Sequence, residues 1–323
     1  MSDWLLIDGA RRLFAETCTH EVVQAAEAEQ WSSLVWDAAA GAGYASLSEL
    51  ELADALAVLT VAGEHAAPVP LAEAALAGWL VGETVAGPVS VAPGGGLRIE
   101  GDSVSGLARR VPWGHAVERI VAVVEGQAVV LSVASAVRVE RHANLAGEPR
   151  DTLVFEAAQP EEVRAAACDL RERGALTRVA LMAGALAAMA RLTVAYAGER
   201  RQFGRPIARF QAVQQHLVCV AQEAALVGAA AEGVARAPGL FEIAAAKVLA
   251  ARAALAASRA AHQVHGAMGM TQEYRLHHFS RRLWAWREEY GDEQHWAARL
   301  GEALAVAGAE NLYPAITGGS AVV

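Results

Sequence analysis

Residues 196–207, with the sequence YAGERRQFGRPI, separate two long segments in which alanine, leucine and valine dominate. Such a composition favours helix over strand. We therefore expect one helix to end near Arg200 and a second to run from about Ile207 to Ala237, where Pro238-Gly239 ends it. On the second helix apolar side chains recur along one face, at Phe210, Val213, Leu217, Val220, Ala224 and Val227.

Further helices are expected on both sides of this pair. The helix that leads to Arg200 is predicted to begin after Pro160, because a proline followed by acidic residues suits a helix N-terminus, with a potential break at Gly174. A third helix is predicted from Leu240 to about His265, and a fourth from Glu293 to Val306. Four long helices joined by short loops indicate an antiparallel bundle.

The chain before this bundle divides into a helical region and a β-rich region. Residues 1–86 read as helices, one of them preceded by the capping-box pattern of Ser46 to Glu49. In residues 87–158 glycine-rich turns separate short β-rich runs, which indicate a small antiparallel sheet or half-barrel. The predicted fold is thus mainly α with a central β domain, divided into a helical domain (1–86), a β domain (87–158) and a helical bundle (159–323).

Composition and charge exclude several classes of protein. The formal net charge is −9 and no long Lys/Arg run is present, so we expect no nucleic-acid binding. The three cysteines are far apart and form no C-x-x-C pair, which favours a reducing, cytoplasmic setting over a disulfide framework or a zinc site. The uncharged apolar run Val179–Ala190 is too short to span a bilayer as a helix, so no membrane span is expected.

Two segments of the helical half carry a specific resemblance. The first is residues 196–207 with Phe210-Gln211-Ala212-Val213 after it, and the second is residues 263–271, QVHGAMGMT, followed by Glu273-Tyr274. Both resemble the acyl-CoA dehydrogenase family, and residues 66–71 give a weaker third match. The resemblance implies the fold of that family, FAD as cofactor, and oxidation of an acyl-CoA thioester as the reaction.

The resemblance also implies which residues hold the cofactor. They are Arg200, Gln202, Phe203, Gln211, Gln263, Gly266, Ala267 and Gly269. Their chemistry suits a dinucleotide, since Arg200 can offer a forked guanidinium to phosphate and Phe203 a flat face to a ring. In the family the residues matching Arg200, Phe203 and Gln263 reach a partner subunit's FAD, which implies at least a dimer. Taken singly, these residues also fit a solvated helix end, a core aromatic and an ordinary helix C-terminus.

The proton acceptor of the family is not found where it is expected. The commonest glutamate position, sixteen residues after Tyr274, holds Tyr290, and tyrosine is a poor base near neutral pH. Glu288 and Glu289 precede it and would serve only after a shift in register. The alternative family position falls at Gly174, with Glu172 two residues away. In the family a threonine-rich strand and a Trp-Ile-Thr type segment contact the flavin ring. The nearest counterpart here is Val111 to Gly114, which contains no threonine.

A retained cofactor cradle without a base resembles the small subunit of heterotetrameric α2β2 acyl-CoA dehydrogenases of actinobacteria. That resemblance implies a homologous large subunit that supplies the glutamate, an acyl-CoA substrate with a steroid side chain, and electron-transfer flavoprotein as acceptor. Two alternatives stay open, a self-sufficient homo-oligomeric dehydrogenase and a non-catalytic scaffold. No metal is expected, because no carboxylates are suitably spaced around His262 and His265 or His277 and His278.

Overall fold

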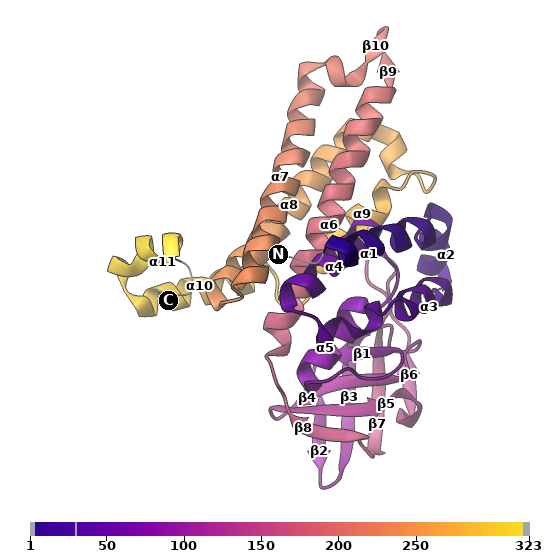
Figure 1. Ribbon diagram of the computed structural model, residues 1–323, viewed down its shortest axis with the longest axis vertical. Coiled ribbons are helices and arrows are strands. Elements are labelled where there is room, and N and C mark those ends of the chain that lie inside the picture. Colours follow the sequence, from indigo (N-terminus) through magenta and orange to yellow (C-terminus); the bar gives the residue numbers. More distant parts are fainter. Residues whose placement is uncertain (1–3, 30, 319–323) are drawn as a thin grey trace. The chain divides into compact units, whose positions relative to one another are not determined.

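The computed structural model describes residues 4–29 and 31–318, and the chain divides into two compact units (Figure 1). The first unit contains residues up to 58 and residues 67–174. The second contains residues 59–66 and everything from residue 175 onward. The division of the chain into three domains at residues 86 and 158 stays a prediction.

Helices open the first unit. They are α1 (Trp4–Thr17), α2 (His20–Glu29), α3 (Ser33–Gly41), the 3₁₀ turn η1 (Tyr44–Glu49), α4 (Leu52–Glu64) and α5 (Leu71–Val81). The capping-box expectation is wrong, because Ser46 to Glu49 lie in η1 and Ser46 has non-helical backbone angles. Ser32 instead caps α3 by accepting a hydrogen bond from Val35 N at 3.4 Å.

The β-rich part of the first unit, predicted as a small antiparallel sheet or half-barrel, forms two four-stranded sheets that are antiparallel at all but one strand pair. One sheet has the order β1-β4-β5-β8, with β1 (Val89–Ala92), β4 (Arg119–Val124), β5 (Gln127–Ser132) and β8 (Glu162–Ala165). The other has the order β2-β3-β7-β6, with β2 (Leu97–Glu100), β3 (Ser103–Pro112), β7 (Arg150–Ala158) and β6 (Arg138–Glu140). Strands β1 and β4 are parallel, with Val89 opposite Arg119, and all other pairs in these sheets are antiparallel.

Both sheets contribute to one apolar core. Its buried members are Ala92, Val104, Ala108, Val111, Trp113, Val117, Ile120, Ala122, Val124, Val129, Leu131, Leu153, Phe155 and Ala158. Side chains from the two sheets therefore meet face to face, as in other sheet-on-sheet packings. Helix α5 packs against β1, and all four residues of that strand are buried.

The second unit is helical, as expected. It holds most of α6 (Leu170–Glu199), then α7 (Gln211–Arg236), α8 (Leu240–His265), α9 (Leu276–Trp286), α10 (Glu293–Ala307) and α11 (Leu312–Gly318). Helix α8 packs against α7, α9 and α10. The predicted fold class, mainly α with a central β region and a C-terminal helical bundle, is confirmed.

Two expectations about α6 are wrong. The segment after Pro160 is not helical but forms β8, which pairs with β5, and α6 begins only at Leu170. In Glu162–Ala165 intermediate and exposed residues alternate, and the hydrogen-bond ladder with β5 outweighs the local helix signal. The helix also passes Gly174 without a break.

Helices α6 and α7 are each long and apolar enough to cross a membrane by length and composition alone. In the most apolar window of α6, 61% is buried inside the protein, against 22% for α7. Core helices of soluble proteins pass the same test, so this is weak support for a span. The sequence analysis counted only the uncharged run Val179–Ala190, which is shorter than the apolar part of α6. The arginines on either side of that run do not stop α6 from meeting the length and composition criteria for a membrane span.

Candidate functional site

The first matched segment forms a hairpin tip between two long helices. Arg200 follows the last residue of α6, and the two-residue strands β9 (Arg201–Gln202) and β10 (Arg205–Pro206) pair antiparallel. A 3₁₀ turn over Ile207–Arg209 then leads to Gln211, the first residue of α7. Figure 1 shows this tip at the far end of the α6–α7 pair. The helix–turn–helix predicted from the sequence is confirmed.

Phe203 lies at the outermost turn of this tip. Its side chain is 92% exposed, and its φ of +51° is in the left-handed region that bulky residues seldom adopt. The ring makes an edge contact with Phe210, with 6.0 Å between centroids, and the Arg205 guanidinium stacks 4.3 Å from the Phe210 ring. Phe203 is therefore not a core residue of this chain, and an exposed ring of this size is available to a ligand or a partner.

The tip is strongly cationic. Arg200, Arg201, Arg205 and Arg209 are all exposed, and residues 200–214 contain no acidic residue. None of the four forms an ion pair within residues 4–29 and 31–318. The N-cap residue of helix α7 is Phe210, which makes no side-chain cap hydrogen bond, so the first N–H groups of the helix can bind an anion. Guanidinium groups beside an uncapped helix N-terminus suit a diphosphate.

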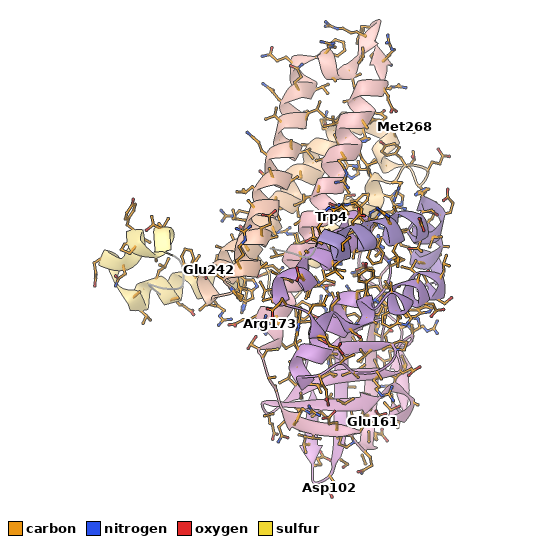
Figure 2. All side chains as sticks on the ribbon, in the orientation of Figure 1. Trp4, Asp102, Glu161, Arg173, Glu242 and Met268 are labelled. Carbon is orange, nitrogen blue, oxygen red and sulfur yellow. The ribbon has the colours of Figure 1, made fainter. Side chains whose placement is uncertain are left out.

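The second matched segment forms the C-terminal end of α8. Gln263, Gly266 and Ala267 are exposed and Gly269 is buried in the 3₁₀ turn over Gly266–Met270. Gly266 has φ +58° and ψ −138°, a combination that is essentially restricted to glycine. Figure 2 labels Glu242 near the start of α8 and Met268 just after its end. The backbone at Gly266 is thus both bare and solvent-facing.

Tyr196 joins the two matched segments. Its hydroxyl donates to the carbonyl oxygen of His265 at 3.3 Å, and its ring stacks on the His265 ring at 4.5 Å between centroids. Tyr274 packs edge-on against Tyr196 at 5.7 Å. Burial lowers the pKa of His265 and raises the pKa of Tyr274, so both rings are favoured in their neutral forms. The structure brings the exposed end of α6 and the end of α8 together, although their residues are far apart in sequence.

Tyr290 occupies a strained turn after α9. Its φ is +56°, and the Arg178 guanidinium lies 5.1 Å from the centre of its ring. Its carbonyl oxygen accepts a hydrogen bond from Trp296 Nε1 at 3.0 Å. A phenol stacked against a permanent cation in a fixed turn is a structural element, and the position carries no carboxylate.

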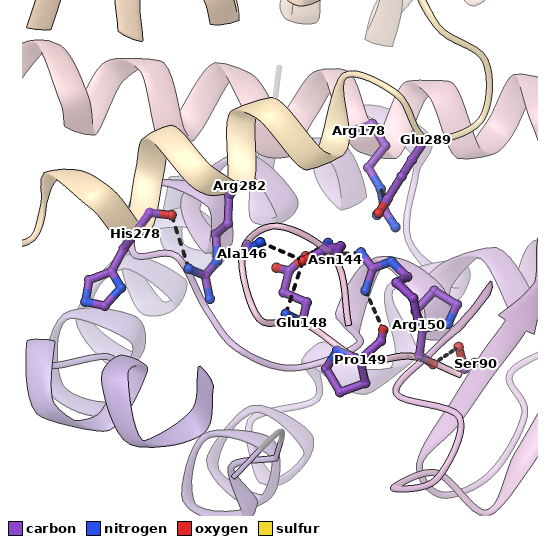
Figure 3. Close-up of polar contacts among 11 residues, drawn as sticks. Ser90, Asn144, Ala146, Glu148, Pro149, Arg150, Arg178, His278, Arg282 and Glu289 are labelled. Atoms are coloured by element: carbon purple, nitrogen blue, oxygen red, sulfur yellow. Dashed lines mark hydrogen bonds and ion pairs between the residues drawn. The ribbon is translucent and has the colours of Figure 1, made fainter. Parts of the chain in front are cut away.

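The two neighbouring glutamates differ in exposure and in partner. Glu289 is buried, and its Oε2 lies 2.6 Å from Nε of Arg178, which is buried as well (Figure 3). Glu288 is exposed and pairs with Arg287 at 3.4 Å. A proton acceptor must be within reach of its substrate. Glu289 is buried and already bound to a buried guanidinium, so it is a poor candidate.

Glu172, the third candidate, lies in the first turn of α6, within the first unit. Its backbone N–H donates to Asp169 Oδ1 at 2.8 Å, which caps the helix start. The position belongs to a helix N-terminus, where an acidic side chain also favours the helix dipole.

Lys247 is a buried residue near the C-terminal end of α9 that sequence reasoning missed. Its Nζ donates to the carbonyl oxygens of Trp286 at 3.2 Å and Arg287 at 2.8 Å, at the C-terminal end of α9. Burial lowers its pKa to about 7, while the negative charge of Glu289 acts in the opposite direction. The only signal was a single lysine inside the alanine-rich run of α8.

Comparisons with known proteins find relatives of the helical half of the chain. Residues 171–304 match the family described as "Acyl-CoA dehydrogenase, C-terminal domain". Over 113 residues the chain is 32% identical to "Acyl-CoA dehydrogenase IpdE2" of Mycolicibacterium smegmatis, a match that covers 35% of this chain and 36% of that protein. The matched segments span only 23% to 36% of the curated relatives' own length.

Solved structures resemble nearly the whole chain. The ChsE4–ChsE5 complex of Mycobacterium tuberculosis gives a TM-score of 0.81 at 22% identity and covers 93% of this chain and 96% of that one. The Tcur3481–Tcur3483 steroid ACAD gives a TM-score of 0.80 at 22% identity, with 93% and 97% covered. Identities of this size establish a shared fold. The chain therefore has the fold of these proteins, and its residues 171–304 are similar to the C-terminal domain of acyl-CoA dehydrogenases.

Proposed function

We propose that this chain is the subunit of an FAD-dependent acyl-CoA dehydrogenase that contributes the ADP half of the flavin site. In this proposal a homologous partner subunit supplies the catalytic carboxylate and most of the acyl pocket. The observation that carries it is a contrast within the second unit. The cation-rich tip is open to a ligand, whereas the position of the base holds Tyr290 and a glutamate bound to Arg178.

The residues at the tip and at the end of α8 fit the ADP portion of FAD. Arg200 would bind the diphosphate through its forked guanidinium, and Gln211 would add an amide at the uncapped start of α7. Phe203 would stack on a ring, with Gln202 beside it. Gln263 and the backbone of Gly266, Ala267 and Gly269 would close the other side, since no side chain at Gly266 obstructs approach.

Bound FAD would supply the hydride acceptor for oxidation of the acyl chain. This chain's own residues would bind and orient the dinucleotide, and the resemblance implies that they do so across a subunit interface. The proton would be taken by the partner's carboxylate. Glu289 is already paired with Arg178, and Glu288 is exposed to solvent and pairs with Arg287.

Two lines of support favour a heteromeric, steroid-directed enzyme. The structures that resemble this chain over more than nine-tenths of its length include a complex of two unlike chains, ChsE4 with ChsE5, and a steroid ACAD named after two chains. The sequence resembles the small subunit of such enzymes. We therefore propose an α2β2 assembly that acts on a steroid side-chain CoA thioester and passes electrons to electron-transfer flavoprotein.

The proposal is tested by producing the chain alone and together with an acyl-CoA dehydrogenase chain from the same organism that carries the catalytic glutamate. We expect flavin and dehydrogenase activity only in the co-purified heteromer. A yellow, active protein from this chain alone would contradict the heteromer. A stable heteromer without flavin and activity would favour a scaffold instead.

A pair of variants tests the cradle. Arg200→Ala is expected to lower the FAD content of the heteromer by tenfold or more at micromolar FAD, since a charge-assisted bidentate bond is lost. Arg236→Ala is the control, because this arginine is also exposed but lies at the C-terminal end of α7, away from the tip. If both variants keep full flavin, the assignment of the tip is wrong.

A further inference from the structure

Tyr196 lies one turn before the end of α6, and it is hydrogen-bonded to both matched segments. Its carbonyl oxygen accepts the backbone N–H of Arg200 at 2.8 Å. Its hydroxyl donates to the carbonyl oxygen of His265, the last residue of α8, at 3.3 Å. One residue therefore connects the base of the tip with the end of α8.

The bond from Tyr196 fixes the peptide group that begins the turn after α8. This group consists of the carbonyl of His265 and the N–H of Gly266, and the N–H donates to the carbonyl oxygen of His262. Both ends of the same peptide group are thus hydrogen-bonded. Gly266 has the backbone freedom of glycine, so without a fixed peptide group the turn over Gly266–Met270 could adopt several orientations.

His265 also holds this turn through packing. Its side chain is buried, and Nδ1 donates to the carbonyl oxygen of Ala261 at 2.8 Å, which sets the orientation of the ring. A Cβ at Gly269 would lie only 2.9 Å from Cβ of His265, so the turn lies directly against this residue. The turn is therefore tied to His265 by its first peptide group and by a close contact three residues later.

Three aromatic rings reinforce the connection. The rings of Tyr196 and His265 stack with 4.5 Å between centroids and 24° between planes. The Tyr274 ring lies 4.9 Å from the His265 ring and 5.7 Å from the Tyr196 ring, so each ring contacts the other two. Aromatic pairs at such distances stabilise a contact beyond the area they bury.

We propose that Tyr196 and His265 are positioning residues of the cofactor cradle. They hold Arg200 and the turn over Gly266–Met270 in one fixed relation, so that the guanidinium and the bare backbone of the turn meet the same diphosphate. This inference rests on the function proposed above, in which both segments bind the ADP half of FAD. A site that is already ordered binds more tightly, because less conformational freedom is lost on binding.

Hydrogen exchange tests the positioning without any cofactor, in the heteromer stripped of flavin. Tyr196→Phe removes the hydroxyl and keeps the ring, and the backbone amides of residues 266–271 should then exchange about fivefold faster, as expected for the loss of one hydrogen bond. Tyr274→Phe is the matched control, since the Tyr274 hydroxyl makes no hydrogen bond within the part of the chain that the structure describes. It should change these rates by less than about twofold. Unchanged exchange in Tyr196→Phe would overturn the inference.

Cofactor affinity tests whether the positioning serves binding. Titration of FAD into the stripped heteromer, followed by flavin fluorescence, should give a Kd about fivefold higher for Tyr196→Phe and about tenfold higher for His265→Ala, which loses the stacked ring. His265→Phe keeps a ring at this position and should return Kd to within about threefold of wild type. If His265→Phe binds FAD as weakly as His265→Ala, the ring is not a positioning element and the inference is wrong.

Kinetics separate positioning from a general loss of structure. At saturating FAD the Tyr196→Phe heteromer should regain the wild-type kcat, because bound cofactor selects the correct arrangement of the turn. Its unfolding midpoint should stay within about 2 °C of wild type. A kcat that stays low at saturating FAD would mean that Tyr196 only supports the fold, which overturns the inference.

The two proposals fail in different ways. Faster exchange in Tyr196→Phe with an unchanged Kd for FAD would overturn this inference and leave the proposed function intact. A wild-type heteromer that binds no FAD would contradict the proposed function, and the exchange rates would still decide whether Tyr196 holds the turn.

Discussion

Charged residues are buried near the start of α6 but exposed in the segment that follows its end. Between Ala175 and Met189 nearly every side chain is buried, and the buried Arg178 is paired with Glu289. From Arg200 to Arg209 four arginines are exposed without any acidic residue among them. One end therefore buries a charge in an ion pair, and the other leaves its arginines exposed to solvent.

The difference has an energetic consequence. Breaking a buried ion pair leaves an uncompensated charge in a low-dielectric surrounding, whereas an exposed charge is solvated with or without a partner. Substitutions at the buried end should therefore change the free energy of unfolding. Substitutions at the tip should change ligand binding and leave stability nearly untouched.

The largest effect is expected at Arg178. Arg178→Met should lower the free energy of unfolding by about 3–5 kcal/mol, because it removes one partner of a buried ion pair. Arg191→Met is the control, since its pair with Glu64 is 3.5 Å long and Arg191 is 60% exposed, and it should cost less than about 1 kcal/mol. Chemical denaturation followed by tryptophan fluorescence measures both. Equal losses would mean that the two ends of α6 do not differ.

A second pair of variants compares two glycines of α6. A Cβ at Gly184 would overlap the carbonyl oxygen of Thr60 in α4, so Gly184→Ala should destabilise the protein by about 1–3 kcal/mol. Gly198 lies near the tip, where a Cβ would meet nothing within 4 Å, and Gly198→Ala should stabilise the helix by up to about 1 kcal/mol. Thermal unfolding of both variants gives the signs. A stabilising Gly184→Ala would refute the close approach of the two helices.

Lys247 should make the stability of the buried end depend on pH. Its pKa is about 7 in the folded protein and near 10.5 when unfolded, so between these values the unfolded chain binds more protons and stability rises with pH. The stability difference between wild type and Lys247→Met should therefore shift in favour of wild type by about 1 kcal/mol from pH 7 to pH 8. Urea titrations of both proteins at each pH measure it. A difference that falls over this interval would contradict the buried, titrating lysine.

The elements that sequence reasoning located well are those with local signals. Helix α8 runs from Leu240 to His265 as predicted, because Pro238-Gly239 and Gly266 mark its two ends. The helix predicted after Pro160 was wrong because β8 depends on hydrogen bonds to β5, about thirty residues earlier in the chain. Local propensity cannot report a partner strand at that distance.

The same limit applies to the candidate site. The motif residues at the tip could be identified in the sequence because they are close together, and their roles in cofactor binding remain predictions. The contacts that join or stabilise the site connect distant positions, namely Tyr196 with His265 and Arg178 with Glu289. A single lysine in an alanine-rich helix gives no indication that it caps another helix. Such pairings follow from packing, which one sequence does not disclose.

The smallest effect on stability is expected at Phe203. Phe203→Gly removes a ring that is 92% exposed and touches Phe210 only edge-on, at a loss of about 0.5 kcal/mol. Glycine also relieves the left-handed conformation at φ +51°, which costs a bulky residue about 1 kcal/mol. The two terms nearly cancel, so the unfolding midpoint of the isolated chain should stay within about 2 °C of wild type. The Phe203 ring makes few contacts within this chain, so a clear loss of flavin from the heteromer with Phe203→Gly would indicate that the ring binds the cofactor. A drop in stability as large as that of Arg178→Met would instead make the tip a structural element like the buried end.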